Sequence, residues 1–443
     1  MKIRFVTLGC KLNFAESSAI GKALLQQGHT RAKQGEEADI CVINTCSVTD
    51  NADHKDRQTI HRIHRQNPNA IIIVTGCYAQ LQPEQIAQIE GVDYVLGQNE
   101  KYEITQLVDD IERLRDSLED ASLQDAASGY SLEAQKIRVA NIREVEEFHG
   151  AYSKDDRTRC FLKVQDGCNY FCTYCTIPYA RGKSRNPKIE EIVKDAQEAI
   201  SQGAKEIILT GVNIGDFGRS TGERFLELLR ALDGLEAKGE RREARGMDYR
   251  IRISSCEPNL LTDEIIDFVA QSKHFAPHFH IPLQSGSNEV LSIMKRRYTR
   301  ELFEERVQHI KQVMPHAFIG VDCMVGVRGE TEEYFSDYVD FIKRLDVSQL
   351  HVFTYSERAN TRMLELDVCI VPKAERQRRS KILHEISEEK TRTFYANQTG
   401  REAIVLWESK KEGDQMAGFT ENYVKVYRPY DKAKVNTFEV IRL

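Results

Sequence analysis

Residues 166–175 read Asp-Gly-Cys-Asn-Tyr-Phe-Cys-Thr-Tyr-Cys, which places Cys168, Cys172 and Cys175 at the spacing C-x3-C-x2-C. In a reducing compartment, thiolates this close together favour an iron–sulfur cluster, zinc or copper(I) over a disulfide. A four-iron cluster normally takes one cysteine per iron, so three cysteines would leave one iron open to a substrate or cofactor. We therefore predict a reactive cluster here. The alternative is structural zinc with a fourth ligand from elsewhere in the chain.

The bulk composition limits the class of protein. The chain has 443 residues, of which 41% are hydrophobic and 29% are charged, and this length predicts roughly three domains. The sequence has no apolar run near the ~20 residues of a membrane span, and it begins with a strand pattern instead of a signal peptide. We therefore expect a cytoplasmic protein with no membrane partner. Eleven cysteines favour metal chemistry, and a net charge of −6 means that any RNA binding depends on local basic patches.

The N-terminal region, residues 1–125, alternates strand and helix patterns. This alternation predicts an α/β fold with an open parallel sheet that is covered on both faces. Cys10, Cys46 and Cys77 each come just after an expected strand. The carboxyl ends of parallel strands lie along one edge, where ligands bind, so we expect the three thiols to converge there. The alternative is three unrelated buried cysteines. Asn13 is expected to cap the first helix.

The rest of the chain divides into three parts. Residues 126–157 are linker-like in composition and predict a connector. Residues 158–385 carry six strand patterns with helices between them, too few for an eight-unit barrel. Residues 386–443 begin within a helix and then carry short strands, which predict a small β-barrel, a shape often used to bind nucleic acid. The charged insertion at residues 237–246 has no readable function.

Polar residues again follow the expected strands of the central part. Gly211 would let the backbone approach a ligand closely, and Asn213 lies beside it. Ser255 and Glu257 follow the next strand and are suited to bind ribose hydroxyl groups. Turn formation or helix capping is the alternative for each. Basic runs at 181–185 and 295–300 are either solvated faces or part of an RNA path.

Several motifs resemble a known family. The string G-C-N-x-x-C-x-Y-C-x-I-P-x-x-R-G at residues 167–182 is similar to the methylthiotransferase branch of the radical S-adenosylmethionine (SAM) enzymes. T-L-G-C-K-L-N at 7–13, N-T-C-S-V-T at 44–49 and G-C-Y-A-Q at 76–80 resemble the N-terminal domain of that family. F-T-E-N-Y at 419–423 resembles the TRAM domain, an RNA-binding barrel.

The resemblance implies two four-iron clusters, two uses of SAM and a six-unit partial barrel over residues 158–385. One cluster would cleave SAM to a 5′-deoxyadenosyl radical and would be held by Cys168, Cys172 and Cys175. An auxiliary cluster would carry the sulfur on its open iron and would be held by Cys10, Cys46 and Cys77. All six cysteines would be needed for turnover. The SAM site would be formed by Tyr174, Gly211, Asn213, Ser255, Glu257, Gln284 and Ser285. An external electron donor of the flavodoxin or ferredoxin type would complete the system.

The substrate is a finer prediction. Family members modify C2 of a tRNA adenosine next to the anticodon, or an aspartate of a ribosomal protein. Residues 10–13 and 419–423 look most like the branch acting on N6-threonylcarbamoyladenosine, so we expect 2-methylthio-N6-threonylcarbamoyladenosine in tRNA as the product. The alternatives are N6-isopentenyladenosine in tRNA, or the ribosomal protein. In a different class, the chain would be a two-cluster electron carrier with an RNA-binding tail.

Overall fold

A computed structural model describes residues 1–33, 35–119, 136–153, 158–235 and 247–443. The chain divides into two compact units. The first comprises Met1–Glu147 and Thr176–Lys183, and the second comprises Phe148–Cys175 and Ser184–Leu443. The insertion at 237–246 and much of the expected connector lie outside the described residues. Of the helices in the described ranges, none is both long and apolar enough to cross a membrane.

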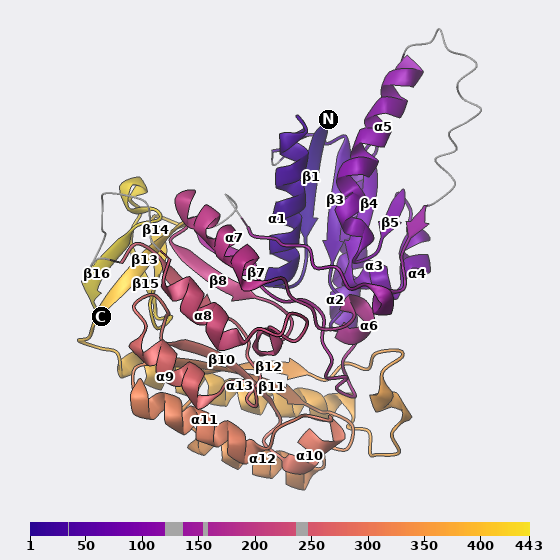
Figure 1. Ribbon diagram of the computed structural model, residues 1–443. Coiled ribbons are helices and arrows are strands. Elements are labelled where there is room, and N and C mark those ends of the chain that lie inside the picture. The colour runs from indigo at the N-terminus through magenta and orange to yellow at the C-terminus, as the bar shows by residue number, and fades with distance from the viewer. Residues whose placement is uncertain (34, 120–135, 154–157, 236–246) are drawn as a thin grey trace. The chain divides into compact units, whose positions relative to one another are not determined.

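The first unit is built on a six-stranded parallel sheet in the order β2-β1-β3-β4-β5-β6 (Figure 1). Its strands are β1 (Lys2–Thr7), β2 (Thr30–Arg31), β3 (Ile40–Thr45), β4 (Ile71–Gly76), β5 (Tyr94–Leu96) and β6 (Ile137–Arg138). Its longer helices are α1 (Lys11–Gln26), α2 (Asp50–Gln66) and α5 (Ile104–Glu119), and its short ones are α3 (Cys77–Leu81), α4 (Pro83–Ala87) and α6 (Ile177–Arg181). The predicted parallel α/β sheet is confirmed.

Side chains along β3 show why helices cover both faces of this sheet. Successive side chains of a strand point to opposite faces. Cys41 packs in the apolar cluster that includes α2, whereas Ile40 and Val42 pack in the cluster that includes α1 and α5. A strand buried on both faces is continuously apolar, as β3 is. Cys41 is therefore a core residue.

The cap expected at Asn13 is wrong. Helix α1 already begins at Lys11, so Asn13 lies in its first turn. Its side-chain amide instead donates to the carbonyl oxygens of Leu8 and Thr45, at 2.9 and 3.0 Å. The Asn13 side chain is buried, and these two bonds satisfy it while joining the chain just beyond β1 to the last residue of β3.

The second unit contains six parallel barrel strands in two sheets, β7-β8-β9 and β10-β11-β12. The strands are β7 (Arg159–Lys163), β8 (Glu206–Thr210), β9 (Arg250–Ile253), β10 (His278–Gln284), β11 (Phe318–Val325) and β12 (Gln349–Thr354). The helices are α7 (Ile189–Ser201), α8 (Phe225–Asp233), α9 (Asp263–Gln271), α10 (Asn288–Ile293), α11 (Arg300–Val313) and α12 (Glu332–Arg344). A parallel bridge between Ser255 and His280 links the two sheets. The expected six-unit partial barrel is confirmed.

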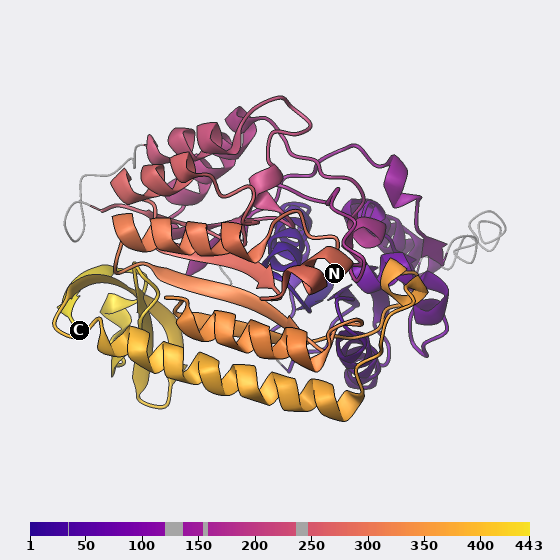
Figure 2. The same ribbon diagram turned by 90° about the horizontal axis from the view of Figure 1, so that it is seen from below.

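A long helix, α13 (Lys373–Ala396), packs against β12 and leads to the C-terminal sheet (Figure 2). This sheet is antiparallel, in the order β15-β14-β13-β16. Its strands are β13 (Glu402–Glu412), β14 (Gln415–Thr420), β15 (Lys425–Pro429) and β16 (Phe438–Arg442). The sheet curls as a half-barrel (Figure 1), in agreement with the small β structure predicted there.

Buried charges join the C-terminal sheet to the amino-terminal ends of the barrel strands. Glu206 forms ion pairs with Arg250 at 2.5 Å and with Arg252 at 3.0 Å. Arg250 also donates to the carbonyl oxygen of Ile404, and Arg252 to that of Glu421, both at 3.1 Å. Burial alone would raise the pKa of Glu206, but the two guanidinium groups hold it well below its usual value. The carboxylate is therefore ionised and balances part of the arginine charge.

Candidate functional site

The three N-terminal cysteines follow three neighbouring strands of the first unit. Cys10 comes after β1, Cys46 directly after β3 and Cys77 directly after β4. These strands are adjacent in the sheet, and adjacent strands lie about 4.8 Å apart. Burial, together with the nearby thiols of Cys77 and Cys10, raises the pKa of Cys46 to about 12. The structure thus brings the three predicted cysteines together at one edge of the sheet.

Two glycines permit this close approach. A Cβ atom on Gly9 would lie 2.6 Å from the Cβ of Cys46 and 2.8 Å from its Sγ. A Cβ atom on Gly76 would lie 2.4 Å from the carbonyl oxygen of Thr45. Both glycines have positive φ, at +91° and +103°, where an L side chain is strained. Cys10 and Cys77 each follow one of these glycines, so the same turns that aim the thiols also keep the strand ends close.

A buried hydrogen-bond network lies against Cys77. Gln98, just after β5, donates from Nε2 to the Sγ of Cys77 at 3.2 Å. Lys101 donates to the side-chain oxygen of Gln98 and forms an ion pair of 2.6 Å with Glu16. Arg181 pairs with the same carboxylate at 3.1 Å. The sequence analysis missed Gln98, Lys101 and Glu16 as functional candidates. The rule used for the cysteines, that ligands follow strands, would have identified Gln98.

Arg181 reaches this network from a distant part of the sequence. Segment Thr176–Lys183 directly follows Cys175, yet it packs as part of the first unit. Its helix α6 contacts α3, and Thr176 donates from Oγ1 to the carbonyl oxygen of Ser47 at 3.3 Å. Arg181 is only 1% exposed. The prediction of an exposed basic run on an RNA path is therefore wrong for Arg181.

In the second unit, one buried amide holds the loop that carries the other three cysteines. Gln165 follows β7 and donates from Nε2 to two carbonyl oxygens of the loop, at 2.8 and 2.7 Å. Its Oε1 accepts from the backbone N–H groups of Val212 and Asn213, both at 2.9 Å. Gln165 thereby fixes the loop against the end of β8. The sequence analysis missed it, because a single glutamine after a strand carries no distinctive pattern.

The thiols of this loop lie in a buried setting with one close cation. Burial raises the pKa of Cys168 to about 12. Burial also raises the pKa of Cys172, although the guanidinium of Arg296 acts against it. Arg296 donates to the Sγ of Cys172 at 3.1 Å and forms an ion pair with Glu257. The Arg296 side chain is only 4% exposed, so the expected RNA path is wrong for this residue as well.

The predicted SAM-binding residues differ in what their side chains contact. The side-chain oxygens Oδ1 of Asn213 and Oε1 of Gln284 are buried without a hydrogen-bond partner among the described residues. Gln284 also has φ +64°, an uncommon conformation for a residue other than glycine. Buried polar atoms are normally paired, so these two atoms are suited to bind a polar ligand. Tyr174 accepts a hydrogen bond from Arg296 at 3.4 Å, which places it beside the loop cation.

The remaining predicted residues also have structural roles. A Cβ on Gly211 would lie 2.9 Å from the carbonyl oxygen of Gln165, so glycine is needed there for packing whether or not a ligand binds. Ser255 continues β9 into a bridge with β10. Ser285 is fully buried and accepts from the backbone N–H of Ser287 at 3.3 Å. Together with the partnerless atoms of Asn213 and Gln284, these polar ends of β8, β9 and β10 fit a cofactor such as SAM.

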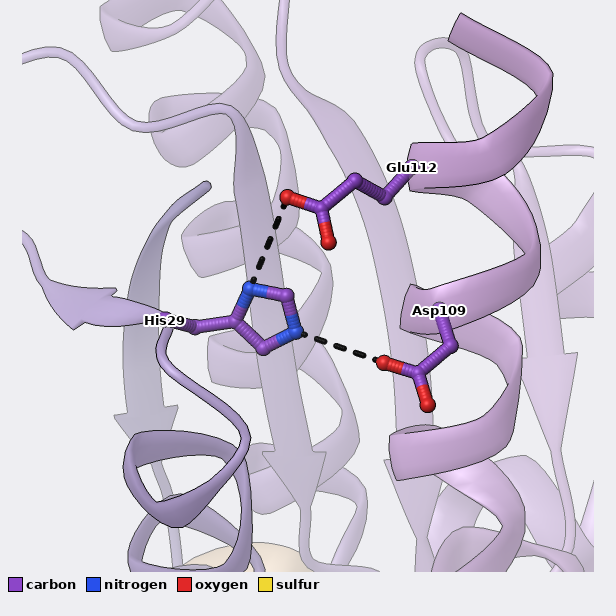
Figure 3. A group of neighbouring side chains, drawn as sticks. All are labelled: His29, Asp109 and Glu112. Atoms are coloured by element: carbon purple, nitrogen blue, oxygen red, sulfur yellow. Dashed lines mark ion pairs between the residues drawn. The ribbon is translucent and has the colours of Figure 1, made fainter. Parts of the chain in front are cut away.

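A separate group of potential metal ligands lies in the first unit, formed by His29, Asp109 and Glu112 (Figure 3). Nε2 of His29 faces Asp109 at 3.6 Å, whereas Nδ1 faces Glu112 at 3.9 Å. Each ring nitrogen thus faces one carboxylate, so ion pairing alone accounts for the arrangement. We interpret the group as an ion-paired link between α5 and the residues before β2.

Two family models and several relatives match this chain, and the relatives match it over almost its whole length. A family model described as "Uncharacterized protein family UPF0004" matches residues 2–97, and one described as "Radical SAM superfamily" matches residues 162–342. The threonylcarbamoyladenosine tRNA methylthiotransferase MtaB of Bacillus subtilis (strain 168) is 37% identical over 430 residues, covering 96% of this chain and 89% of the relative. MtaB of Aquifex aeolicus (strain VF5) is 35% identical, with 97% of each chain covered.

A relative named for another substrate has a lower identity to this chain. The tRNA-2-methylthio-N(6)-dimethylallyladenosine synthase of Pelotomaculum thermopropionicum is 31% identical, covering 94% of this chain and 88% of the relative. Among solved structures, the radical S-adenosylmethionine methyltransferase TsrM of Kitasatospora setae superposes with a TM-score of 0.56 at 15% identity, covering 79% of this chain and 72% of that one. At this identity the match bears on the fold alone.

Proposed function

This chain belongs to the radical S-adenosylmethionine methylthiotransferases, and we propose that it adds a methylthio group to C2 of N6-threonylcarbamoyladenosine in tRNA. It is a tRNA methylthiotransferase, as its relatives over nearly the full chain are. The finer assignment is supported by similarity, since the threonylcarbamoyladenosine enzymes at 37% and 35% identity rank above the dimethylallyladenosine enzymes at 31% and 30%.

We assign the six cysteines to two four-iron clusters. The SAM-binding cluster, which the family implies, would be held by Cys168, Cys172 and Cys175. A second cluster would be held by Cys10, Cys46 and Cys77. The observation that carries this assignment is the arrival of three thiols at the ends of three adjacent strands. Thiolates are the usual ligands of such clusters, and the raised pKa of Cys46 means that cluster binding would displace its proton.

When bound, SAM and the clusters supply a radical that removes hydrogen from an unreactive C–H bond, together with the sulfur and methyl group that replace it. The residues of the chain hold and orient these groups. Asn213 and Gln284 would satisfy their buried oxygens on SAM, with Ser255 and Glu257 at its ribose. Arg296 would keep Glu257 in place. An external flavodoxin or ferredoxin would deliver the electron.

The charge beside the auxiliary site supports the substrate proposed. The threonylcarbamoyl group ends in a carboxylate, whereas the isopentenyl group is apolar. Lys11 directly follows Cys10 and is exposed. It is also the first residue of α1, and the amino-terminal end of a helix favours negative charge. An anionic substituent next to this site would therefore meet a cationic side chain and a favourable helix dipole.

A competition assay tests the proposal. The protein is reconstituted anaerobically with iron and sulfide, then given SAM, dithionite and equal amounts of two tRNAs carrying N6-threonylcarbamoyladenosine or N6-isopentenyladenosine. We expect methylthiolation of the first to dominate. Lys11→Gln should narrow this preference about tenfold, since a charged hydrogen bond contributes ~1.5–3 kcal/mol. Lys55→Gln, an exposed change on α2, is the control.

Three other results would contradict different parts of the proposed function. Preferential methylthiolation of isopentenyladenosine would contradict the proposed substrate and keep the chemistry. Modification of a ribosomal protein and of neither tRNA would contradict the tRNA assignment. Cluster binding without any release of 5′-deoxyadenosine from SAM would favour the electron carrier over a methylthiotransferase.

A further inference from the structure

We propose that Glu16, Lys101 and Arg181, here called the buried triad, set the reduction potential of the second cluster through the individual charges that they place behind its ligands. Gln98 would transmit part of this effect through its hydrogen bond to Cys77. The inference rests on the second cluster assigned above and adds to it a role for residues that hold no metal.

The triad is a continuous chain of contacts within the first unit. Glu16 lies at the centre, with Lys101 at 2.6 Å on one carboxylate oxygen and Arg181 at 3.1 and 3.2 Å on both oxygens. Arg181 also donates to the side-chain oxygen of Asn13 at 2.6 Å, which lies in the first turn of the helix that Cys10 precedes. The triad therefore contacts α1, the helix that Cys10 precedes, and is linked to Cys77 through Gln98.

The charges of the triad are shielded from water. Two cations face one carboxylate, and all three side chains are at most 1% exposed. Interactions between charges are much stronger in such a medium than in water. Each charge of the triad therefore acts strongly on any charge added at the neighbouring ligand Cys77, which Gln98 links to Lys101 through two hydrogen bonds.

Reduction of a cluster adds one negative charge, so a nearby positive charge makes reduction easier. Net charge and hydrogen bonds to the sulfurs are the main protein influences on the potential of an iron–sulfur cluster. Lys101, Arg181 and the N–H···S bond from Gln98 act toward a higher potential, whereas Glu16 acts toward a lower one. Each member contributes with a known sign. Loss of Lys101 or Arg181 should lower the potential, whereas neutralising Glu16 should raise it.

Arg181 links the triad to the segment that follows the SAM-cluster loop. It belongs to the segment 176–183, which continues directly from Cys175 and packs in the first unit. Without this segment only Lys101 and Glu16 of the triad would remain. The positive charge that Arg181 places behind the second cluster therefore depends on the chain that leaves the SAM-cluster loop.

The test uses the full chain with Cys168, Cys172 and Cys175 all changed to alanine, so that only the second cluster can assemble. After anaerobic reconstitution, iron is counted and the potential is measured by redox titration with detection of the reduced cluster by electron paramagnetic resonance. Arg181→Met and Lys101→Met should shift the midpoint to more negative values. Glu16→Gln, which keeps the shape of the side chain, should shift it to more positive values. Arg113→Met, at a side chain 74% exposed, should leave it unchanged.

The opposite signs of the expected shifts separate an electrostatic role from a structural one. Loosening of the site alone would not shift the midpoint potential in both directions. If a charge variant fails to fold, Gln98→Leu removes the N–H···S bond without changing charge and should lower the potential. Midpoints that stay fixed, or that all shift the same way, would overturn the inference while leaving the second cluster in place. A chain that binds no iron in this background would overturn the second cluster itself, and the inference with it.

Discussion

The guanidinium of Arg296 lies 3.1 Å from the Sγ of Cys172 and donates a hydrogen bond to it. The same side chain forms an ion pair with Glu257, so one buried cation contacts both a predicted cluster cysteine and a predicted SAM-binding carboxylate. Arg296 thus gives the buried Cys172 thiol a stabilising partner. It lies at the proposed cofactor site, where the sequence predicted either a solvated face or contact with RNA.

Arg296→Met should therefore weaken SAM cleavage and leave tRNA binding intact. We expect at least about a tenfold loss in the rate of 5′-deoxyadenosine release, because a hydrogen bond to a charged group contributes ~1.5–3 kcal/mol. The salt dependence of tRNA affinity should not change, because the side chain is buried. Lys295→Met, in the same basic run but exposed, is the matched control. If Arg296→Met cleaves SAM normally but its tRNA affinity depends less on salt, Arg296 contacts RNA instead.

Gln165→Leu should destabilise the loop proposed to carry the SAM cluster. The leucine removes the acceptor for the backbone N–H groups of Val212 and Asn213, and an unsatisfied buried donor costs ~1–3 kcal/mol. We expect a lower melting temperature and less iron per chain in a background with Cys10, Cys46 and Cys77 changed to alanine. Gln202→Leu, on an exposed turn, should do neither. Full iron occupancy in Gln165→Leu would mean that the loop holds its shape without this amide.

Gly9→Ala should displace the proposed second cluster by steric conflict. Its Cβ would lie 2.6 Å from the Cβ of Cys46. Gly28→Ala is the matched control, since Gly28 has φ +96° and nothing within 4 Å of an added Cβ. Both changes force an L residue into an unfavourable conformation, at ~1–3 kcal/mol, but only the first should lose iron, by about half in a chain built for two equal clusters. Equal iron in the two variants would contradict this account of the site.

Much of the site could be predicted from the sequence because its signals are local. Apolar strands followed by Cys10, Cys46 and Cys77 are short patterns, and the topology of parallel sheets brings their ends together. The buried triad could not be predicted in this way. Glu16 and Arg181 are 165 residues apart, and an ion pair between distant residues leaves no periodic pattern in either segment.

The basic runs show a second limit of prediction from the sequence. Arg296 and Lys295 are neighbours of similar charge, yet the Arg296 side chain is buried beside Cys172 and Lys295 is exposed. The backbone decides between them, because Lys295 has φ +54° after the end of α10 and turns the chain. Helix α1 likewise begins at Lys11, two residues before the predicted Asn13 cap, because the buried Asn13 amide bonds instead to the ends of two strands.

Glu206→Gln should destabilise the second unit, because it leaves Arg250 and Arg252 buried without their carboxylate. Breaking a buried ion pair costs ~3–5 kcal/mol, which urea unfolding at about pH 7 would measure. The folded pKa of Glu206 is held below its usual value, so its ion pairs stabilise the fold fully above ~4.3, the ordinary carboxyl pKa. This stability is lost as the pH falls from there through the depressed folded value.

The difference between wild type and Glu206→Gln should thus be constant from about pH 7 to about pH 5 and shrink at lower pH. Glu264→Gln breaks an ion pair with Arg224 that is mostly exposed and should cost less than ~1 kcal/mol. A similar small cost for Glu206→Gln would show that the buried arginines are held by the carbonyl oxygens of the C-terminal sheet alone.

Nucleoside mass spectrometry of tRNA tests the central claim most directly. The chain is expressed in a host that lacks methylthiolated tRNA, and the digested tRNA is compared with that from cells expressing Cys172→Ala or Cys46→Ala. The account predicts a new peak of 2-methylthio-N6-threonylcarbamoyladenosine that both variants lose. A methylthio peak on isopentenyladenosine alone, or a threonylcarbamoyladenosine product that persists in Cys46→Ala, would contradict it.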